Sequence, residues 1–249
     1  MRRMSLLPKP EFGKLRLLEE KSTDREIILV PGFFSNSFMP YTEWVKNIRK
    51  VDKESSVFVF YWDTKNFTEF VLRILMLKNT SLTIGEIVKR IGSPGGFLVS
   101  AGVEFFRMWE EAKANTRFYA RKLLKEIEKR HKLKQKEIIL IGHSLGVRLI
   151  YHLLGIADKG MVSKVYMLGG AIGVKVNWRN CAKKVRLITN CYSKNDMVLR
   201  ILYRIAEIGE MPVGVEKIGK KIPNLKEIDC SRQVDKHTSY FKAVNMWFK

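Results

Sequence analysis

Residues 137–154 constrain this chain of 249 residues more than any other segment, because they read as a strand, a sharp turn and a helix in direct succession. The aliphatic run at 138–141 is typical of a parallel strand that is buried on both faces. Gly-His-Ser-Leu-Gly at 142–146 follows at once, and apolar residues at helical spacing come after it. This order matches the G-x-S-x-G nucleophile elbow, in which a strained turn carries the serine. The segment therefore predicts a nucleophilic Ser144; the alternative is a tight glycine turn whose serine has no role.

Apolar runs and helical patterns alternate along the rest of the chain. Strands are predicted at residues 14–18, 26–30, 57–62, 138–141, 162–168, 185–191 and 226–230. Helices are predicted directly after the elbow and at residues 41–48, 117–132, 198–208 and 240–247. Strands that alternate with helices form parallel sheets. We therefore expect one α/β domain over residues 1–249, with a doubly wound, mainly parallel sheet.

Residues 66–116 interrupt this alternation, because a crossover helix needs only about a dozen residues. Two apolar stretches lie in this interval, one from residue 67 to 75 and one from 97 to 106. Helices inserted between the sheet and the nucleophile suit a lid or cap over a substrate. Extra core helices without a gating role explain the pattern equally well, so both interpretations stay open.

The charge balance is unusual, with 46 Lys and Arg against 25 Asp and Glu and a formal net charge of +21. Such an excess favours polyanions, among them phospholipid headgroups. Arg73 and Lys78 lie beside the apolar stretch of the insertion, as in an interfacial segment. A lysine-rich proteome would also produce this excess. Because no nucleic-acid module is evident, we expect no nucleic-acid partner.

Cysteine usage and hydropathy indicate a cytoplasmic protein, with peripheral contact to an anionic membrane as one possibility. The three cysteines, Cys181, Cys191 and Cys230, show no disulfide or metal-ligand spacing. No run of about 18 uncharged apolar residues is present that would span a bilayer. We expect neither a metal nor another cofactor.

A serine hydroxyl needs a positioned base to become a good nucleophile, and the chain has four histidines. His131 ends a charged helix, His143 lies on the elbow itself, and His152 lies two turns along the following helix. His237 follows the last predicted strand, at the sheet edge where Ser144 is expected. We therefore predict His237 as the base.

The acid that orients the base is expected after the strand that precedes the last one. Asp196 occupies that loop. Asp235 is closer to His237 in sequence, but a separation of two residues seldom gives the required geometry, and Asp229 on the last strand is a weaker rival. The predicted order Ser144, Asp196, His237 is the α/β-hydrolase order.

Two backbone N–H groups are predicted to form an oxyanion hole. One belongs to Leu145, directly after the nucleophile at a helix start, where the helix dipole adds positive potential. The other belongs to Phe33, after Gly32 in the loop that follows an early strand. The alternative for Phe33 is a buried aromatic residue on a loop.

Three segments carry a resemblance to the α/β-hydrolase superfamily, and within it to hydrolases typified by transmembrane-and-coiled-coil-domain proteins. Ile-Gly-His-Ser-Leu-Gly-Val-Arg-Leu-Ile-Tyr at 141–151 resembles the nucleophile segment of that group, and Tyr-Ser-Lys-Asn-Asp-Met-Val-Leu at 192–199 resembles its acid-bearing loop. Asp-Lys-His at 235–237 resembles its histidine region. The resemblance implies an α/β-hydrolase fold and a Ser-Asp-His triad. This chain is short and lacks a membrane-spanning pair, so it resembles the hydrolase domain alone.

These features lead us to expect a serine hydrolase that cleaves acyl esters through an acyl-enzyme, with lipid esters as a substrate class that the apolar insertion and basic surface would suit. A thioesterase or acyltransferase is an alternative, because the same acyl-enzyme divides among acceptors. A non-catalytic binding module on the same fold is the alternative from another class.

Overall fold

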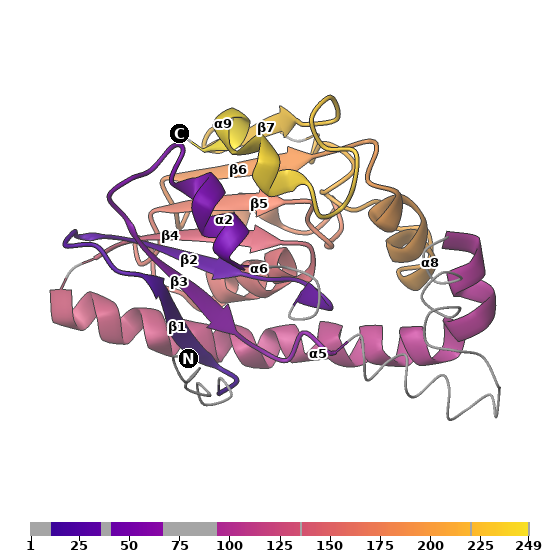
Figure 1. Cartoon of the computed structure of the whole chain (residues 1–249), viewed down its shortest axis with the longest axis horizontal. Coiled ribbons are helices and arrows are strands. Elements are labelled where there is room, and N and C mark those ends of the chain that lie inside the picture. The colour runs from indigo at the N-terminus through magenta and orange to yellow at the C-terminus, as the bar shows by residue number, and fades with distance from the viewer. Residues whose placement is uncertain (1–10, 36–40, 67–93, 135, 220, 249) are drawn as a thin grey trace, which may run out of the picture.

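The computed structural model describes residues 11–35, 41–66, 94–134, 136–219 and 221–248. Its described strands form a sheet of seven in the order β1-β3-β2-β4-β5-β6-β7 (Figure 1). The strands are β1 (Lys14–Glu19), β2 (Arg25–Val30), β3 (Ser56–Tyr61), β4 (Glu137–His143), β5 (Lys164–Leu168), β6 (Leu187–Tyr192) and β7 (Leu225–Asp229). Strand β1 pairs with β3 in the antiparallel direction, whereas the other pairs are parallel. The prediction of an α/β fold with a mainly parallel sheet is confirmed.

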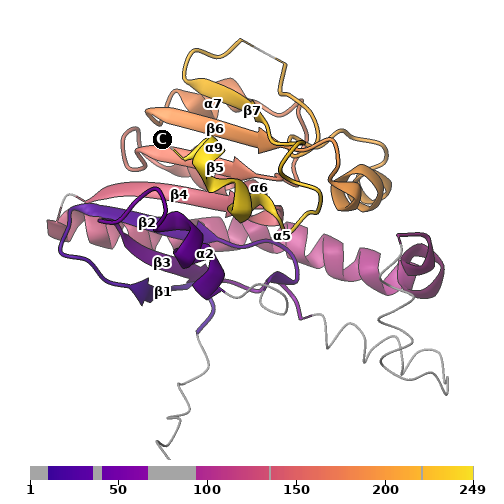
Figure 2. The same cartoon turned by 45° about the horizontal axis from the view of Figure 1, so that its top comes forward.

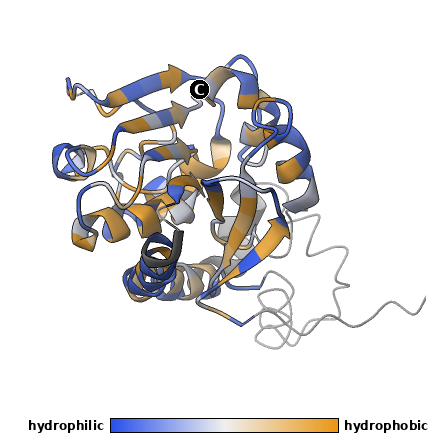
Figure 3. Cartoon of the chain, turned by 90° about the vertical axis from the view of Figure 1, so that its left-hand side faces the viewer, coloured by the Kyte–Doolittle hydropathy of each residue, from blue (hydrophilic) through white to orange (hydrophobic). Residues whose placement is uncertain are grey.

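Helices cover both faces of this sheet (Figures 1 and 2). They are α2 (Tyr41–Ile48), α5 (Pro94–Lys134), α6 (Leu145–Ile156), α7 (Trp178–Ala182), the π-helix η1 (Val198–Tyr203), α8 (Arg204–Ala206), the 3-10 helix η2 (Tyr240–Ala243) and α9 (Val244–Trp247). Alternate strand residues point to opposite faces, so each face carries its own apolar cluster. Ile28 packs with the residues of α5 and α6, while Ile27 packs with Trp44 of α2 and Trp247 of α9. Figure 3 shows hydrophobic colour gathered toward the middle of the view and hydrophilic colour more frequent at its periphery.

Helix α5 runs without a break for 41 residues and therefore crosses the boundary between the predicted insertion and the predicted helix at 117–132. Proline at its first position fits a helix start, because proline lacks the N–H that would have no partner there. Residues 67–93, which include Arg73 and Lys78 beside the predicted apolar stretch, lie outside the described residues. A lid or cap role for residues 66–116 therefore stays a prediction. Across the described ranges, no helix combines the length and apolar character needed to cross a bilayer.

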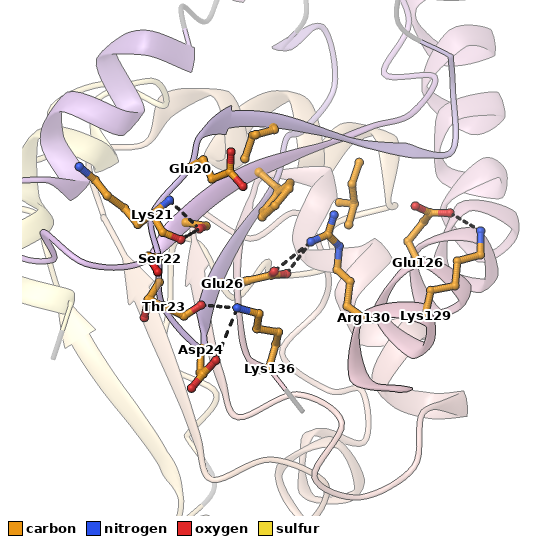
Figure 4. A pocket seen from close by; sticks show the side chains of 14 residues that line it. Glu20, Lys21, Ser22, Thr23, Asp24, Glu26, Glu126, Lys129, Arg130 and Lys136 are labelled. Carbon is orange, nitrogen blue, oxygen red and sulfur yellow. Dashed lines mark hydrogen bonds and ion pairs between the residues drawn. The ribbon is translucent and has the colours of Figure 1, made fainter. Parts of the chain in front are cut away.

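A cavity of about 1140 Å³ opens at the amino end of β2, between the β1–β2 connection and the last turns of α5 (Figure 4). Arg130 closes one side by donating to both carboxylate oxygens of Glu26, at 3.0 and 2.8 Å. The Arg130 guanidinium also lies 4.0 Å from the centroid of the Phe58 ring. Lys136 donates to the carbonyl of Thr23 beside this pair. Several of the charged groups drawn here pair with one another, as Lys129 does with Glu126, and the cavity lies at the sheet edge opposite the elbow.

The Glu26–Arg130 pair gives a test of the fold. Glu26 is only 5% exposed, so Arg130→Met would leave a buried carboxylate without its partner. We expect a loss of about 2 kcal/mol in the free energy of unfolding, below the range for fully buried pairs because Arg130 retains some contact with water. Urea denaturation measures this loss. Lys129→Met is the matched control, because Lys129 pairs with Glu126 on the solvent side of α5 and such pairs contribute little. Equal losses in both variants would contradict this account.

Candidate active site

Ser144 alone separates strand β4 from helix α6, so the predicted strand, turn and helix are present. Its φ of 54° lies in the left-handed region, which a non-glycine residue adopts only under strain. Backbone hydrogen bonds hold this conformation. The Ser144 N–H donates to the Leu168 carbonyl at 3.0 Å, and the Ser144 carbonyl accepts from the Val147 and Ala171 N–H groups at 3.1 and 3.0 Å. The turn is therefore fixed to the end of β5 and to the loop that follows it.

Two glycines are required here because other backbone atoms approach them closely. A Cβ at Gly146 would lie 2.0 Å from the Val30 carbonyl oxygen, so any side chain would push α6 away from the end of β2. A Cβ at Gly32 would lie 2.5 Å from the Ser144 Cβ and 3.1 Å from the Leu145 nitrogen. The loop after β2 and the start of α6 are therefore in direct contact.

Asp196 and His237 meet at the same edge of the sheet. His237 Nδ1 lies 2.7 Å from Asp196 Oδ2, although the two residues are 41 positions apart in sequence. The Asp196 carboxylate is fully buried, and its oxygens also accept from the Tyr240 hydroxyl and the Leu199 N–H, both at 3.1 Å. With Nδ1 donating to the carboxylate, the other ring nitrogen of His237, Nε2, remains as the basic one.

His143 connects the elbow to the segment that carries His237. Its Nε2–H donates to the His237 carbonyl at 2.8 Å, and the two imidazole centroids are 4.7 Å apart. Burial, and then the nearby His237, lower the pKa of His143 to about 3, so the ring is neutral near pH 7. Sequence reasoning left His143 without a structural role, because a bond to a distant backbone carbonyl has no signature in the residue pattern.

The predicted oxyanion donors, Phe33 and Leu145, come from the two segments that touch at Gly32. Neighbouring N–H groups are already engaged: Phe34 N–H donates to the Thr64 carbonyl at 2.8 Å, and Gly32 N–H donates to Ser35 Oγ at 2.9 Å. Among the described residues, no hydrogen bond from the N–H group of Phe33 or Leu145 is found. Their use as oxyanion donors stays a prediction.

The Phe33 ring has a separate packing role. It stacks on Phe34 with a centroid separation of 3.9 Å and contacts Phe105 and Trp109 of α5 at 5.8 and 5.7 Å. The buried-aromatic interpretation therefore describes the side chain, while the oxyanion role concerns the backbone N–H, and the two are compatible.

The rival acids Asp235 and Asp229 have partners other than His237. Asp235 accepts from the Ser239 hydroxyl at 3.0 Å, and Asp229 accepts from the Ser231 N–H at 2.9 Å. Burial, followed by the positive charges of Arg117 and Arg148, lowers the pKa of His152 to about 4. Tyr240, which shares the Asp196 carboxylate with His237, was not identified from sequence, where it reads only as an apolar helix residue.

One family model matches nearly the whole chain, whereas each of the relatives described below matches half of it or less. Residues 11–249 match the family model described as "Protein of unknown function (DUF726)". The transmembrane and coiled-coil domain-containing protein STS1 of Oryza sativa subsp. japonica is 30% identical over 132 residues, which is 50% of this chain and 20% of that protein. The uncharacterized membrane protein C6F6.13c of Schizosaccharomyces pombe is 30% identical over 115 residues, covering 44% of this chain and 15% of that protein. The probable lipase MIL1 of Saccharomyces cerevisiae is 30% identical over 119 residues, covering 45% of this chain and 11% of that protein. The match therefore spans a fifth or less of each relative.

Burial of neutral His143 predicts a pH dependence of stability. The unfolded chain protonates this histidine below its usual pKa of 6.5, whereas the folded chain does so only near 3, so stability is lost as the pH falls through this window. One such group should remove about 2 kcal/mol of unfolding free energy between pH 7 and pH 5. His143→Gln keeps a donor for the His237 carbonyl and should reduce this slope, while His152 maintains part of it. Urea denaturation at the two pH values measures the effect, and an unchanged slope would contradict it.

Proposed function

This chain belongs to the DUF726 family, and we propose that it is a serine hydrolase that cleaves acyl esters through a covalent acyl-enzyme. Ser144 is the proposed nucleophile, His237 the base, and Asp196 the acid that orients it. The Asp196–His237 hydrogen bond carries this proposal, because it joins a fully buried carboxylate to the imidazole of His237. The backbone carbonyl of His237 in turn accepts from His143, the residue next to Ser144. An acid, a base and a strained serine at one sheet edge are the parts that acyl transfer needs.

In the proposed reaction, Ser144 Oγ attacks the ester carbonyl while His237 Nε2 accepts its proton. Asp196 holds the imidazole in the Nδ1–H tautomer and stabilises the imidazolium that forms. The negative charge on the carbonyl oxygen receives hydrogen bonds from Phe33 and Leu145 N–H. His237 then returns the proton to the leaving alcohol, and a water molecule releases the acid from Ser144 by the same steps in reverse order.

Lipid esters are the proposed substrate class. The relative named as a probable lipase and the strongly basic composition support this choice. A thioesterase or acyltransferase would use the same acyl-enzyme and differs only in the leaving group or the acceptor. A binding module without activity would leave the Ser144 hydroxyl unreactive. A cytoplasmic location stays a prediction.

Reactivity of Ser144 separates the enzyme from the binding module. A fluorophosphonate probe should label the native chain on Ser144, because the probe traps a serine that is activated by a base. Ser144→Ala should lose labelling and should lower ester turnover by a factor on the order of 10⁴ or more. Labelling is followed by gel fluorescence and by mass spectrometry of the modified peptide. Ser163→Ala is a control on a serine that bonds Glu137 at the opposite edge. Absence of labelling on the folded native chain would overturn the proposal.

Substitution of the two aspartates tests which one orients His237. Asp196→Asn should lower kcat by a factor on the order of 10⁴, because the amide NH₂ facing Nδ1 favours the wrong imidazole tautomer. Asp235→Asn should leave kcat nearly unchanged, because Asp235 bonds Ser239 on an exposed turn. Steady-state kinetics on a short-chain ester measure both variants, with circular dichroism to verify folding. The reverse ranking would assign the acid role to Asp235.

A further inference from the structure

The helical segment that follows Asp196 carries an exposed apolar ridge, formed by Met197, Val198, Ile205 and Ile208. Their exposed fractions are 46%, 41%, 44% and 98%. Met197, Ile201 and Ile205 follow one another four residues apart, and Ile208 lies in the turn beyond α8. Leu199 and Tyr203 of the same segment are buried. Figure 1 shows α8 at the periphery, beyond the carboxyl ends of the strands.

Four of the eight large apolar side chains that are exposed in the described part of the chain lie within these twelve positions. Single exposed apolar residues are normal, whereas such a concentration marks an interaction surface. Ile208 is the clearest case, because it is almost fully exposed and has a φ of 50°. A β-branched residue is disfavoured in this left-handed conformation, and its side chain gains little burial that would offset the strain.

Cations flank the ridge. Arg200 and Arg204 are exposed on the same segment, and Lys194 is exposed just before it. Arg200 donates to the Lys194 carbonyl at 3.2 Å, and among the described residues neither arginine has a carboxylate partner within ion-pair distance. Guanidinium groups that have no carboxylate partner and lie beside the apolar ridge complement a surface that is both anionic and apolar. A bilayer of anionic phospholipids presents such a surface.

We propose that the ridge and its two arginines dock this chain on the surface of an anionic bilayer. Apolar side chains enter the boundary between headgroups and acyl chains, while Arg200 and Arg204 contact lipid phosphates. The acidic side chains of the segment itself, Glu207 and Glu210, face inward: Glu207 bonds Arg148 and Trp109, and Glu210 bonds Tyr203. On the adjacent helix α5, the exposed Glu110 pairs with Lys113, and Glu111 pairs with Arg107 and Lys65. They therefore do not oppose contact with the anionic surface.

The position of the ridge connects docking to the candidate active site. The ridge segment directly follows Asp196, whose Oδ1 accepts the Leu199 N–H at 3.1 Å. Docking would therefore bring the edge that carries Ser144, Asp196 and His237 toward the lipid. Delivery of a lipid ester to Ser144 rests on the proposed hydrolase function, whereas binding of the bilayer does not.

Vesicle co-sedimentation of the Ser144→Ala chain tests docking without turnover. The probes are vesicles of phosphatidylcholine alone and of phosphatidylcholine mixed with phosphatidylserine. We expect binding to the anionic vesicles that weakens with added salt, and much weaker binding to the neutral ones. Ile205→Ser and Ile208→Ser should each weaken anionic-vesicle binding by about tenfold, which corresponds to about 1.4 kcal/mol. Arg200→Gln and Arg204→Gln should each weaken it by about fivefold and lower its salt dependence.

The matched controls lie at the opposite edge of the sheet. Ile156→Ser removes an isoleucine that is 49% exposed at the end of α6, and Lys159→Gln removes an exposed cation nearby. Neither should change vesicle binding.

Docking by the ridge is overturned if the ridge and control variants bind alike, or if neutral and anionic vesicles bind equally. It is also overturned if light scattering shows a dimer that Ile208→Ser dissociates, because the ridge would then be an interface between two chains. Probe labelling of Ser144 is a separate readout, so failure of docking and failure of the hydrolase proposal are distinguishable.

Discussion

The close backbone approach between the start of α6 and the end of β2 is the constraint on which the rest of the site depends. Gly146 faces the Val30 carbonyl where a Cβ would be only 2.0 Å away, and Gly32 faces Ser144 in the same manner. A larger residue at either position would separate the two segments and so move the Phe33 and Leu145 N–H groups apart. Because carboxyl ends of parallel strands share one edge, Asp196 and His237 then reach the same place from β6 and from the loop after β7.

A buried polar chain fixes that arrangement. It runs from Tyr240 through Asp196 and His237 to His143, with hydrogen bonds of 3.1, 2.7 and 2.8 Å. In a low-dielectric interior such a chain is rigid only if its members find partners. Burial, and then the Asp196 charge, raise the pKa of Tyr240 well above its ordinary value, so the phenol keeps its proton and donates. Its ring also occupies the space that a Cβ at Gly169 would need, where φ is +53°.

Much of the fold could be predicted from sequence, because continuous apolar runs identify buried strands and the chain order then places the loops. The helix at 41–48 and the mainly parallel sheet are confirmed. The continuity of α5 across residue 116 was missed, although its buried side chains recur at helical spacing from Phe105 through Thr116 to Ile127. The proximity of Asp196 to His237 agrees with the topological argument, while their roles stay predictions. His143 and Tyr240 could not be found, because their partners are a backbone carbonyl and a carboxylate far away in sequence.

The candidate site is also linked to the segments that flank it, through one carboxylate. Glu207 Oε1 accepts from Trp109 of α5 at 3.1 Å, and it pairs with Lys113 at 3.2 Å and with Arg148 of α6 at 3.3 Å. The side chains of Glu207 and Arg148 are only 12% and 15% exposed, so removal of the carboxylate would leave cations without a partner in a poorly hydrated place. Arg148 also donates to the Ala171 carbonyl at 3.2 Å, and Ala171 N–H bonds the Ser144 carbonyl. A displacement of α5 or of the segment that bears α8 would therefore reach the elbow through one ion pair and two hydrogen bonds. Because this connection is short, we expect contacts made by the outer helices to shift the backbone that holds Ser144.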